Sequence, residues 1–145
     1  MNLFFDARPP ELTWCRMEGD TVEERKEIFS EDLLAWTAPV GTDATIGYLL
    51  HHGGQAVTRP ITILSPENLE EIRQSIWLFP EQSDLTFKTA AVMMQRFPHA
   101  RHLLFCDTGF YTDLPPEASA YAVPASLRKQ GVRRYGGYGI FHQWA

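Results

Sequence analysis

Cysteine is scarce in this chain of 145 residues, which contains only Cys15 and Cys106. Each lies in an apolar, strand-like run, so we expect buried reduced thiols rather than disulfides or a metal site. No apolar run reaches the roughly 18 to 20 residues that cross a membrane. The apolar start, Met1–Phe5, is followed at once by Asp6, Arg8 and prolines. We therefore expect neither a signal peptide nor an anchor, and a cytoplasmic protein.

Positive charge is also in short supply. The chain has 13 Lys and Arg against 18 Asp and Glu, a formal net charge of -5, and its cations are scattered. Nucleic acids and anionic membranes attract proteins through basic stripes, so neither is an expected partner. Repeats and low-complexity segments are missing, and the length fits a single domain over residues 1–145.

The sequence does contain alternating strand-like and helix-like segments. Residues 2–6 and 12–17 read as strands on either side of Arg8-Pro9-Pro10, which predicts a hairpin-like start. Apolar runs at 44–51 and 102–106 predict two buried strands. Strands that alternate with helices after a hairpin indicate an α/β fold with a mixed sheet and flanking helices.

Three helices are predicted from their start signals and apolar spacing. The first begins at Ser30, the second at Ser65-Pro66, and the third covers about 84–97, with prolines at 39 and 98 ending the first and third. Their apolar positions are Leu33, Leu34 and Trp36; Leu69, Ile72, Ile76 and Trp77; and Phe87, Ala91, Met94 and Phe97.

Asp107 follows the predicted strand 102–106 directly. In open α/β sheets, the carboxyl end of a strand faces the ligand crevice. A carboxylate there can orient or deprotonate an attacking oxygen. Together with Thr108, it can equally cap the turn through side-chain to backbone bonds. The residues leave both roles open.

Two segments carry a resemblance to a known family. Residues 105–115 read FCDTGFYTDLP, and residues 133–142 read RRYGGYGIFH. They resemble F-D-T-A-F-H-Q-T-M-P and R-R-Y-G-F-H-G-T-S-H of the acetate kinases, which include butyrate and propionate kinases in the sugar kinase and actin superfamily. The resemblance implies a ribonuclease-H-like mixed sheet, as in the first domain of those kinases. It does not extend to their carboxyl-terminal nucleotide-binding domain, which we expect to be absent.

The resemblance also assigns a catalytic pair. Asp107 matches the family's catalytic aspartate, here expected to be vestigial, and Tyr138 replaces the histidine that stabilises the transferring phosphoryl group. Leu49 replaces an arginine thought to hold the substrate carboxylate. The family's amino-terminal phosphate loop aligns with residues 6–13, where prolines remove amide donors and Glu11 adds negative charge.

Other positions in the matching motifs are candidates for substrate binding. Metal binding is not expected at the adjacent histidines 51 and 52, because neighbours on a strand point to opposite faces and no third ligand is evident. The two arginines at 133 and 134, like Asp6, Arg8 and Glu11, have solvated surface positions as their alternative role. The candidates are His51, His52, Gly53, Gly54, Phe110, Arg133, Arg134 and His142.

Phosphoryl transfer depends on magnesium and positioned cations, so the isolated chain is predicted to lack carboxylate kinase activity and to hold no cofactor. A binding or interaction module is expected instead. The alternatives are one subunit of a split, acyl-phosphate-forming kinase, whose separate second chain supplies ATP and Mg binding, and a small binder of carboxylate or phosphate near Asp107.

A candidate contact surface lies near the end of the chain. Tyr138, Phe141 and Trp144 are spaced by three and predict one aromatic stripe if they lie on a helix. Such a stripe would contact a partner protein or a second copy of the chain. Its other interpretation is packing against the domain's own core.

Overall fold

The fold is built on a six-stranded mixed sheet with the order β3-β2-β1-β4-β6-β5. The structure is a computed structural model, and it describes residues 1–37, 40–41, 43–75 and 79–145. The strands are β1 (Asn2–Arg8), β2 (Glu11–Glu18), β3 (Thr21–Phe29), β4 (Thr45–Leu50), β5 (Ile61–Ile63) and β6 (Arg101–Cys106). The predicted α/β fold with a mixed sheet is confirmed.

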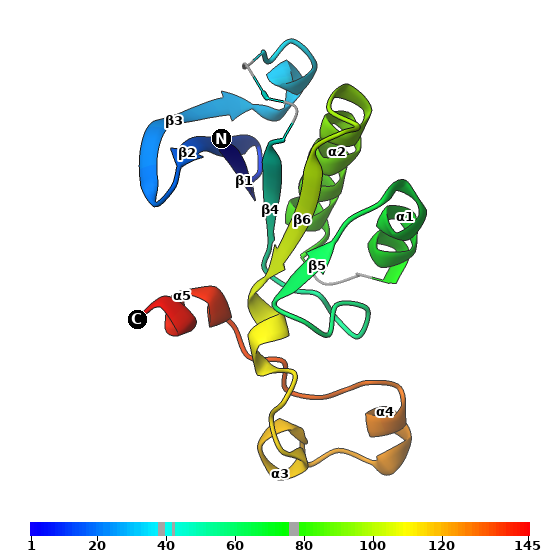
Figure 1. The fold of residues 1–145 in the computed structure, drawn as a ribbon. Coiled ribbons are helices and arrows are strands. Elements are labelled where there is room, and N and C mark those ends of the chain that lie inside the picture. The colour runs from blue at the N-terminus through cyan, green and yellow to red at the C-terminus, as the bar shows by residue number, and fades with distance from the viewer. Residues whose placement is uncertain (38–39, 42, 76–78) are drawn as a thin grey trace.

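The helices lie on both sides of this sheet and beyond its end. Figure 1 shows α1 and α2 together beside β4 and β6, whereas α3 and α4 lie past the carboxyl end of β6 and α5 lies toward the β1–β3 side. The helices are α1 (Pro66–Ser75), α2 (Pro80–Arg96), α3 (Pro116–Ser119), α4 (Ala125–Lys129) and α5 (Gly139–Trp144), with short 3-10 helices η1 (Ser30–Leu34) and η2 (Asp107–Tyr111).

The register of the central strands sets the position of the site. β1, β4 and β6 run parallel, with Asp6 paired to Leu49 and Leu50 paired to Cys106. Residues that follow β4 and β6 therefore meet at one edge of the sheet, close to the end of β1. His51 and Asp107 are those residues.

The core lies between the sheet and α2. Along β1, side chains alternate as a strand requires, with Leu3, Phe5 and Ala7 buried and the residues between them half-buried. On α2, Phe87 is buried as predicted, but Ala91 and Met94 are only half-buried, as is Phe97 directly after the helix. The helix begins at Pro80, and its fully buried positions include Thr86, Thr89, Ala90 and Met93.

Two local predictions differ from the structure. The segment at Ser30 forms a five-residue 3-10 helix, in which Leu33 is buried while Leu34 is 74% exposed. One short turn cannot direct both adjacent side chains to the core. The predicted helix end at Pro39 and the apolar positions Ile76 and Trp77 lie outside the described residues.

Both cysteines are free; Cys106 is buried and Cys15 is half-buried. The expected burial thus holds for Cys106 but not fully for Cys15. Burial raises the pKa of both thiols, which disfavours the nucleophilic thiolate. Among the described residues, no helix is long and apolar enough to span a membrane.

Candidate functional site

Asp107 is held in place at the sheet edge by two contacts. It is buried at the start of η2, and its Oδ2 lies 2.9 Å from His51 Nδ1. Its Oδ1 accepts a hydrogen bond of 3.2 Å from the backbone N–H of Ile140, in α5. Because a carboxylate only accepts, Nδ1 carries the proton in the first contact. Asp107 thus connects β4, β6 and α5.

The cluster continues from His51 to the end of β1. His51 Nε2 lies 4.0 Å from Asp6 Oδ1, and Asp6 Oδ2 accepts a hydrogen bond of 2.8 Å from Arg8 Nε. Asp6 Oδ1 is buried and has no hydrogen-bond partner among the described residues. The imidazole therefore lies between two carboxylates. Asp6 and Arg8 were expected as solvated turn residues, but Asp6 faces the site from within β1.

A cavity of about 350 Å³ opens beside this cluster. His51 and Asp107 line it together with Tyr138. Among the described residues that line it there is no lysine or arginine, so a bound anion would meet no fixed positive charge and would face the Asp107 carboxylate. The other lining residues are His52, Phe79, Gly136 and Gly137.

His52 serves the loop that closes β4. It is buried, and its Nδ1 accepts a hydrogen bond of 3.1 Å from the N–H of Gly54. Burial lowers its pKa, which favours the neutral ring that this contact needs. Its ring packs edge-on against Tyr135 at 4.8 Å between centroids and also contacts Phe79. The two adjacent histidines thus have different surroundings.

The loop after His52 requires glycine at positions 53 and 54. The N–H of Gly53 donates to Thr108 Oγ1 at 2.9 Å. A Cβ at Gly53 would lie 2.6 Å from Cys106 Sγ, so a side chain does not fit there. Gly54 has a φ of +55°, which favours glycine. Thr108 therefore fixes the loop, while the Asp107 carboxylate contacts His51 and the Ile140 N–H.

Tyr138 lies over the cavity but is 73% exposed. It precedes α5 with a φ of +55°, which is unusual for a residue with a side chain. The next residue, Gly139, lies against Asp107, where a Cβ would be 2.2 Å from its carbonyl oxygen. This close contact lets the Ile140 N–H reach the Asp107 carboxylate.

The remaining candidates do not gather at Asp107. Arg133 lines a separate cavity with Tyr135 and Tyr121, and Arg134 is exposed with its guanidinium 5.6 Å from the Tyr121 ring centroid. Phe110 packs edge-on against Tyr111 and beside Gly139. His142 is exposed, with its ring 6.4 Å from that of Tyr111.

The aromatic stripe is exposed. Phe141 and Trp144 are 59% and 81% exposed, and their ring centroids are 5.9 Å apart on α5. Tyr138 precedes them on the same short segment. The structure therefore does not pack this stripe into the core.

Leu49 and Gln82 both contribute to the scaffold. Leu49 lines an apolar cavity of about 450 Å³ with Phe4 and Phe105. Its carbonyl oxygen accepts hydrogen bonds from Gln82 Nε2 at 3.2 Å and from Thr86 Oγ1 at 3.1 Å. Gln82, which the resemblance matches to a family histidine, is thus buried in α2.

Chemically, the cluster can accept or pass a proton and can orient a hydroxyl group. It offers no guanidinium or ammonium group within the cavity beside Asp107. Across the described residues, no group of three or more His, Cys, Asp and Glu is arranged to hold a metal ion. Asp6 and Phe79 were not among the sequence candidates; only the strand register and the start of α2 place them here.

Comparison with known sequences identifies relatives. The profile of the acetokinase family matches residues 36–145. An acetate kinase of Deinococcus radiodurans is 34% identical over 100 residues, which are 68% of this chain and 25% of that protein. A propionate kinase of Yersinia enterocolitica is 33% identical over 100 residues, 68% of this chain and 24% of its own length. The chain thus spans about a quarter of the length of these relatives.

Comparison with solved structures agrees. A propionate kinase from Francisella tularensis superposes with a TM-score of 0.77 and 18% identity, covering 99% of this chain and 46% of that one. Acetate kinase from Entamoeba histolytica gives 0.77 and 16%, covering 99% and 44%. At such identities the likeness establishes the fold, and the predicted likeness to the first domain of an acetate kinase is confirmed. With three quarters of its length matched by the family profile, the chain belongs to the acetokinase family.

Proposed function

We propose that this chain is a binding or interaction module of the acetokinase family, and that it does not form acyl phosphates by itself. The observation that carries the proposal is the cavity beside Asp107, whose lining contains an aspartate, two histidines and two aromatic rings but no lysine or arginine. Phosphoryl transfer requires the developing negative charge to be offset by cations. Asp107 instead adds negative charge to that wall.

The amino-terminal hairpin supports the same proposal. β1 and β2 are joined at Pro9-Pro10, and neither proline has an N–H to offer a phosphate. Glu11 follows as the first residue of β2. Arg8 is already paired with Asp6 at 2.8 Å. A phosphate at this hairpin would meet few donors and one carboxylate.

Leu49 supports it from the substrate side. A guanidinium binds a carboxylate through two parallel hydrogen bonds, which a leucine cannot form. Phe4 and Phe105 lie around Leu49 and make its surroundings apolar. An acetate ion would therefore find no cationic partner at Leu49 itself; among the described residues that line this cavity, the cation is Arg25, from the edge strand β3.

A second candidate is one subunit of a split kinase completed by a separate chain. The orientation of Asp107 favours it, because two contacts fix the carboxylate at the sheet edge before any ligand arrives. In that case, ATP and Mg would bind only when the second chain is present. Leu49 and Tyr138 would still predict weak catalysis or a different substrate.

Titration calorimetry separates the two candidates. We expect no heat of binding when ADP with magnesium is added to the pure chain at about millimolar concentration. The same titration is repeated with a second chain that carries the nucleotide domain. Binding only in the mixture would favour the split kinase. Binding to the pure chain would contradict the split kinase and the expectation that the chain alone holds no nucleotide.

A further inference from the structure

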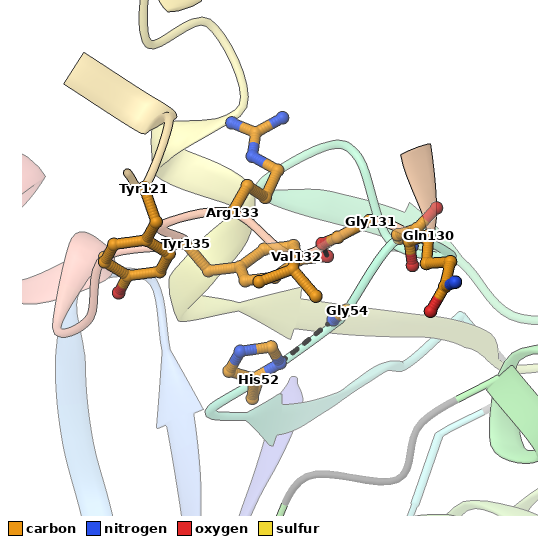
Figure 2. Close-up of a pocket in the computed structure, with 10 residues that line it drawn as sticks. His52, Gly54, Tyr121, Gln130, Gly131, Val132, Arg133 and Tyr135 are labelled. Atoms are coloured by element: carbon orange, nitrogen blue, oxygen red, sulfur yellow. Dashed lines mark hydrogen bonds between the residues drawn. The ribbon is translucent and has the colours of Figure 1, made fainter. Parts of the chain in front are cut away.

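We propose that the cavity at Arg133, which adjoins the one at Asp107 through His52 and Gly136, binds a small aromatic carboxylate. This inference does not rest on the function proposed above. The cavity measures about 520 Å³, within the usual range for small-molecule sites. Its lining comes from the loop after β4, from Tyr121 between α3 and α4, and from the segment between α4 and α5, parts of the chain that the fold brings together (Figure 2). The lining residues are His52, Gly54, Gln55, Tyr121, Gln130, Gly131, Val132, Arg133, Tyr135 and Gly136.

Arg133 supplies the charge. It is half-buried and forms no ion pair with any residue that the structure describes. A second cavity, of about 250 Å³, also reaches Arg133 and adds threonines 58, 108 and 112 to the surroundings. Neither cavity has an aspartate or glutamate in its lining. An anion at the guanidinium would therefore face no opposing negative charge from either side, and carboxylates fit its planar fork.

Aromatic rings supply the second part of the recognition. Figure 2 shows the Tyr135 ring between His52 and Arg133. The His52 ring is 4.8 Å from it edge-on, and the Arg133 guanidinium carbon is 5.6 Å from its centroid. Tyr121 lines the same cavity and is 44% exposed. Rings held in this way offer contact area to a planar group of a ligand.

One positive charge favours a monoanion. His52 does not add a second charge, because burial lowers its pKa. Arg134, the neighbouring cation, is placed over Tyr121 and is not part of the cavity lining. A singly charged carboxylate therefore matches the site better than a doubly charged phosphate ester.

The test is an NMR titration of the ¹⁵N-labelled chain with benzoate. We expect saturable shifts at the amides of Gly54, Gly131 and Gly136, with a Kd on the order of 1 mM. Benzamide has the same shape without the charge, and it should bind at least about tenfold more weakly. Phenyl phosphate and acetate should also bind more weakly than benzoate, because the first carries excess charge and the second lacks a ring.

Two substitutions and a matched control complete the experiment. Arg133→Gln should weaken benzoate binding about tenfold or more, and Tyr121→Leu should weaken benzoate but leave the weaker acetate binding unchanged. Arg101→Gln removes the same charge at the exposed amino end of β6 and should change nothing.

The proposal is overturned by absence of saturation at about 20 mM benzoate, or by equal binding of benzamide. It is also overturned if phenyl phosphate binds more tightly, or if shifts are confined to the Asp107 cavity. If Arg133→Gln does not fold, the comparison of benzoate with benzamide and the effect of Tyr121→Leu still test whether the site recognises an aromatic carboxylate.

Discussion

The parallel register of β4 with β6 places His51 beside Asp107. The main role of His51 is to hold this buried carboxylate. Its Nδ1 lies 2.9 Å from Asp107, whose side chain is only 9% exposed, while His51 itself is 38% exposed. Charged hydrogen bonds of this kind contribute modestly when one partner is near solvent. The orientation of Asp107 thus depends on a hydrogen bond to His51 that can be removed by substitution without opening the core.

We predict that His51→Ala lowers the free energy of unfolding by about 1 kcal/mol, because Asp107 then keeps only the Ile140 N–H as a partner. The measurement is urea denaturation at neutral pH. His99→Ala is the control, since His99 is exposed on the loop before β6, and it should have no effect. Equal effects of the two changes would contradict the role given to His51.

His102 makes stability depend on pH. It is buried, its Nδ1 accepts a hydrogen bond of 2.8 Å from the Tyr48 hydroxyl, and its Nε2–H donates to the Phe97 carbonyl at 3.1 Å. Burial lowers its pKa below the ordinary value of 6.5, as it does for His52. The unfolded chain therefore binds more protons than the folded chain once the pH falls below that value.

We predict full stability from these two histidines above about pH 6.5 and a progressive loss as the pH falls below it, by at most about 1.4 kcal/mol per pH unit for each. Urea midpoints between pH 7.5 and 5 would measure the slope. His102→Gln should make it shallower. A midpoint that stays constant, or rises, as the pH falls through this window would disprove the assignment.

At the scale of elements, the packing of α5 against η2 includes a close approach that only a glycine at position 139 allows. A Cβ at Gly139 would lie 2.2 Å from the Asp107 carbonyl oxygen and 2.3 Å from Phe110 Cβ, whereas a Cβ at Gly137 would meet nothing within 4 Å. The two glycines are two residues apart and make a matched pair. The packing of α5 and the hydrogen bond from the Ile140 N–H to Asp107 depend on Gly139.

We predict that Gly139→Ala detaches α5, because overpacking of this kind typically costs about 1 to 3 kcal/mol. Hydrogen exchange at the Ile140 amide should become about tenfold faster or more, which corresponds to the lower end of that cost. Gly137→Ala should leave the rate unchanged. If both variants exchange like the parent chain, the close contact does not hold α5.

Elements with apolar periodicity were predictable, and those held mainly by strand pairing were not. β1, β4, β6 and α1 follow their patterns. β3 was not predicted because Thr21–Phe29 is dominated by charged residues, and it forms an edge strand through pairing with β2. β5 has three residues, of which Ile61 and Ile63 are exposed, too short for a periodic signal.

The site was predictable only in part. Asp107 at a strand end could be read from the sequence, but its contact with His51 joins residues 56 positions apart and follows from parallel pairing of β4 with β6. Arg133 and Tyr138 belong to one motif but line different cavities, and only Tyr138 lines the cavity that contains Asp107. The spacing within the motifs therefore identified candidate residues, but it did not show which of them lie in the same cavity.

At the scale of the whole molecule, exposed aromatic side chains gather near the carboxyl-terminal end. Tyr138, Phe141 and Trp144 are each more than half exposed. Large exposed apolar groups of this kind often mark contact sites. They are the surface that we expect to meet a partner protein or a second copy of the chain.

We predict that the chain self-associates at about 100 µM, near the low-affinity end of protein contacts, and that Trp144→Ser with Phe141→Ser shifts it to monomer. Light scattering coupled to size-exclusion chromatography measures the mass. Leu34→Ser is the control, since Leu34 is 74% exposed on η1, away from α5. A parent chain that stays monomeric would leave only a different partner protein for this surface.

The central proposal is that this member of the acetokinase family has the fold of its relatives but does not transfer phosphate by itself. The direct measurement is formation of acyl phosphate by the pure chain from ATP, magnesium and acetate, propionate or butyrate, trapped with hydroxylamine. We predict no product above the protein-free reaction. Product that scales with the concentration of the chain and is lost in Asp107→Asn would contradict the claim.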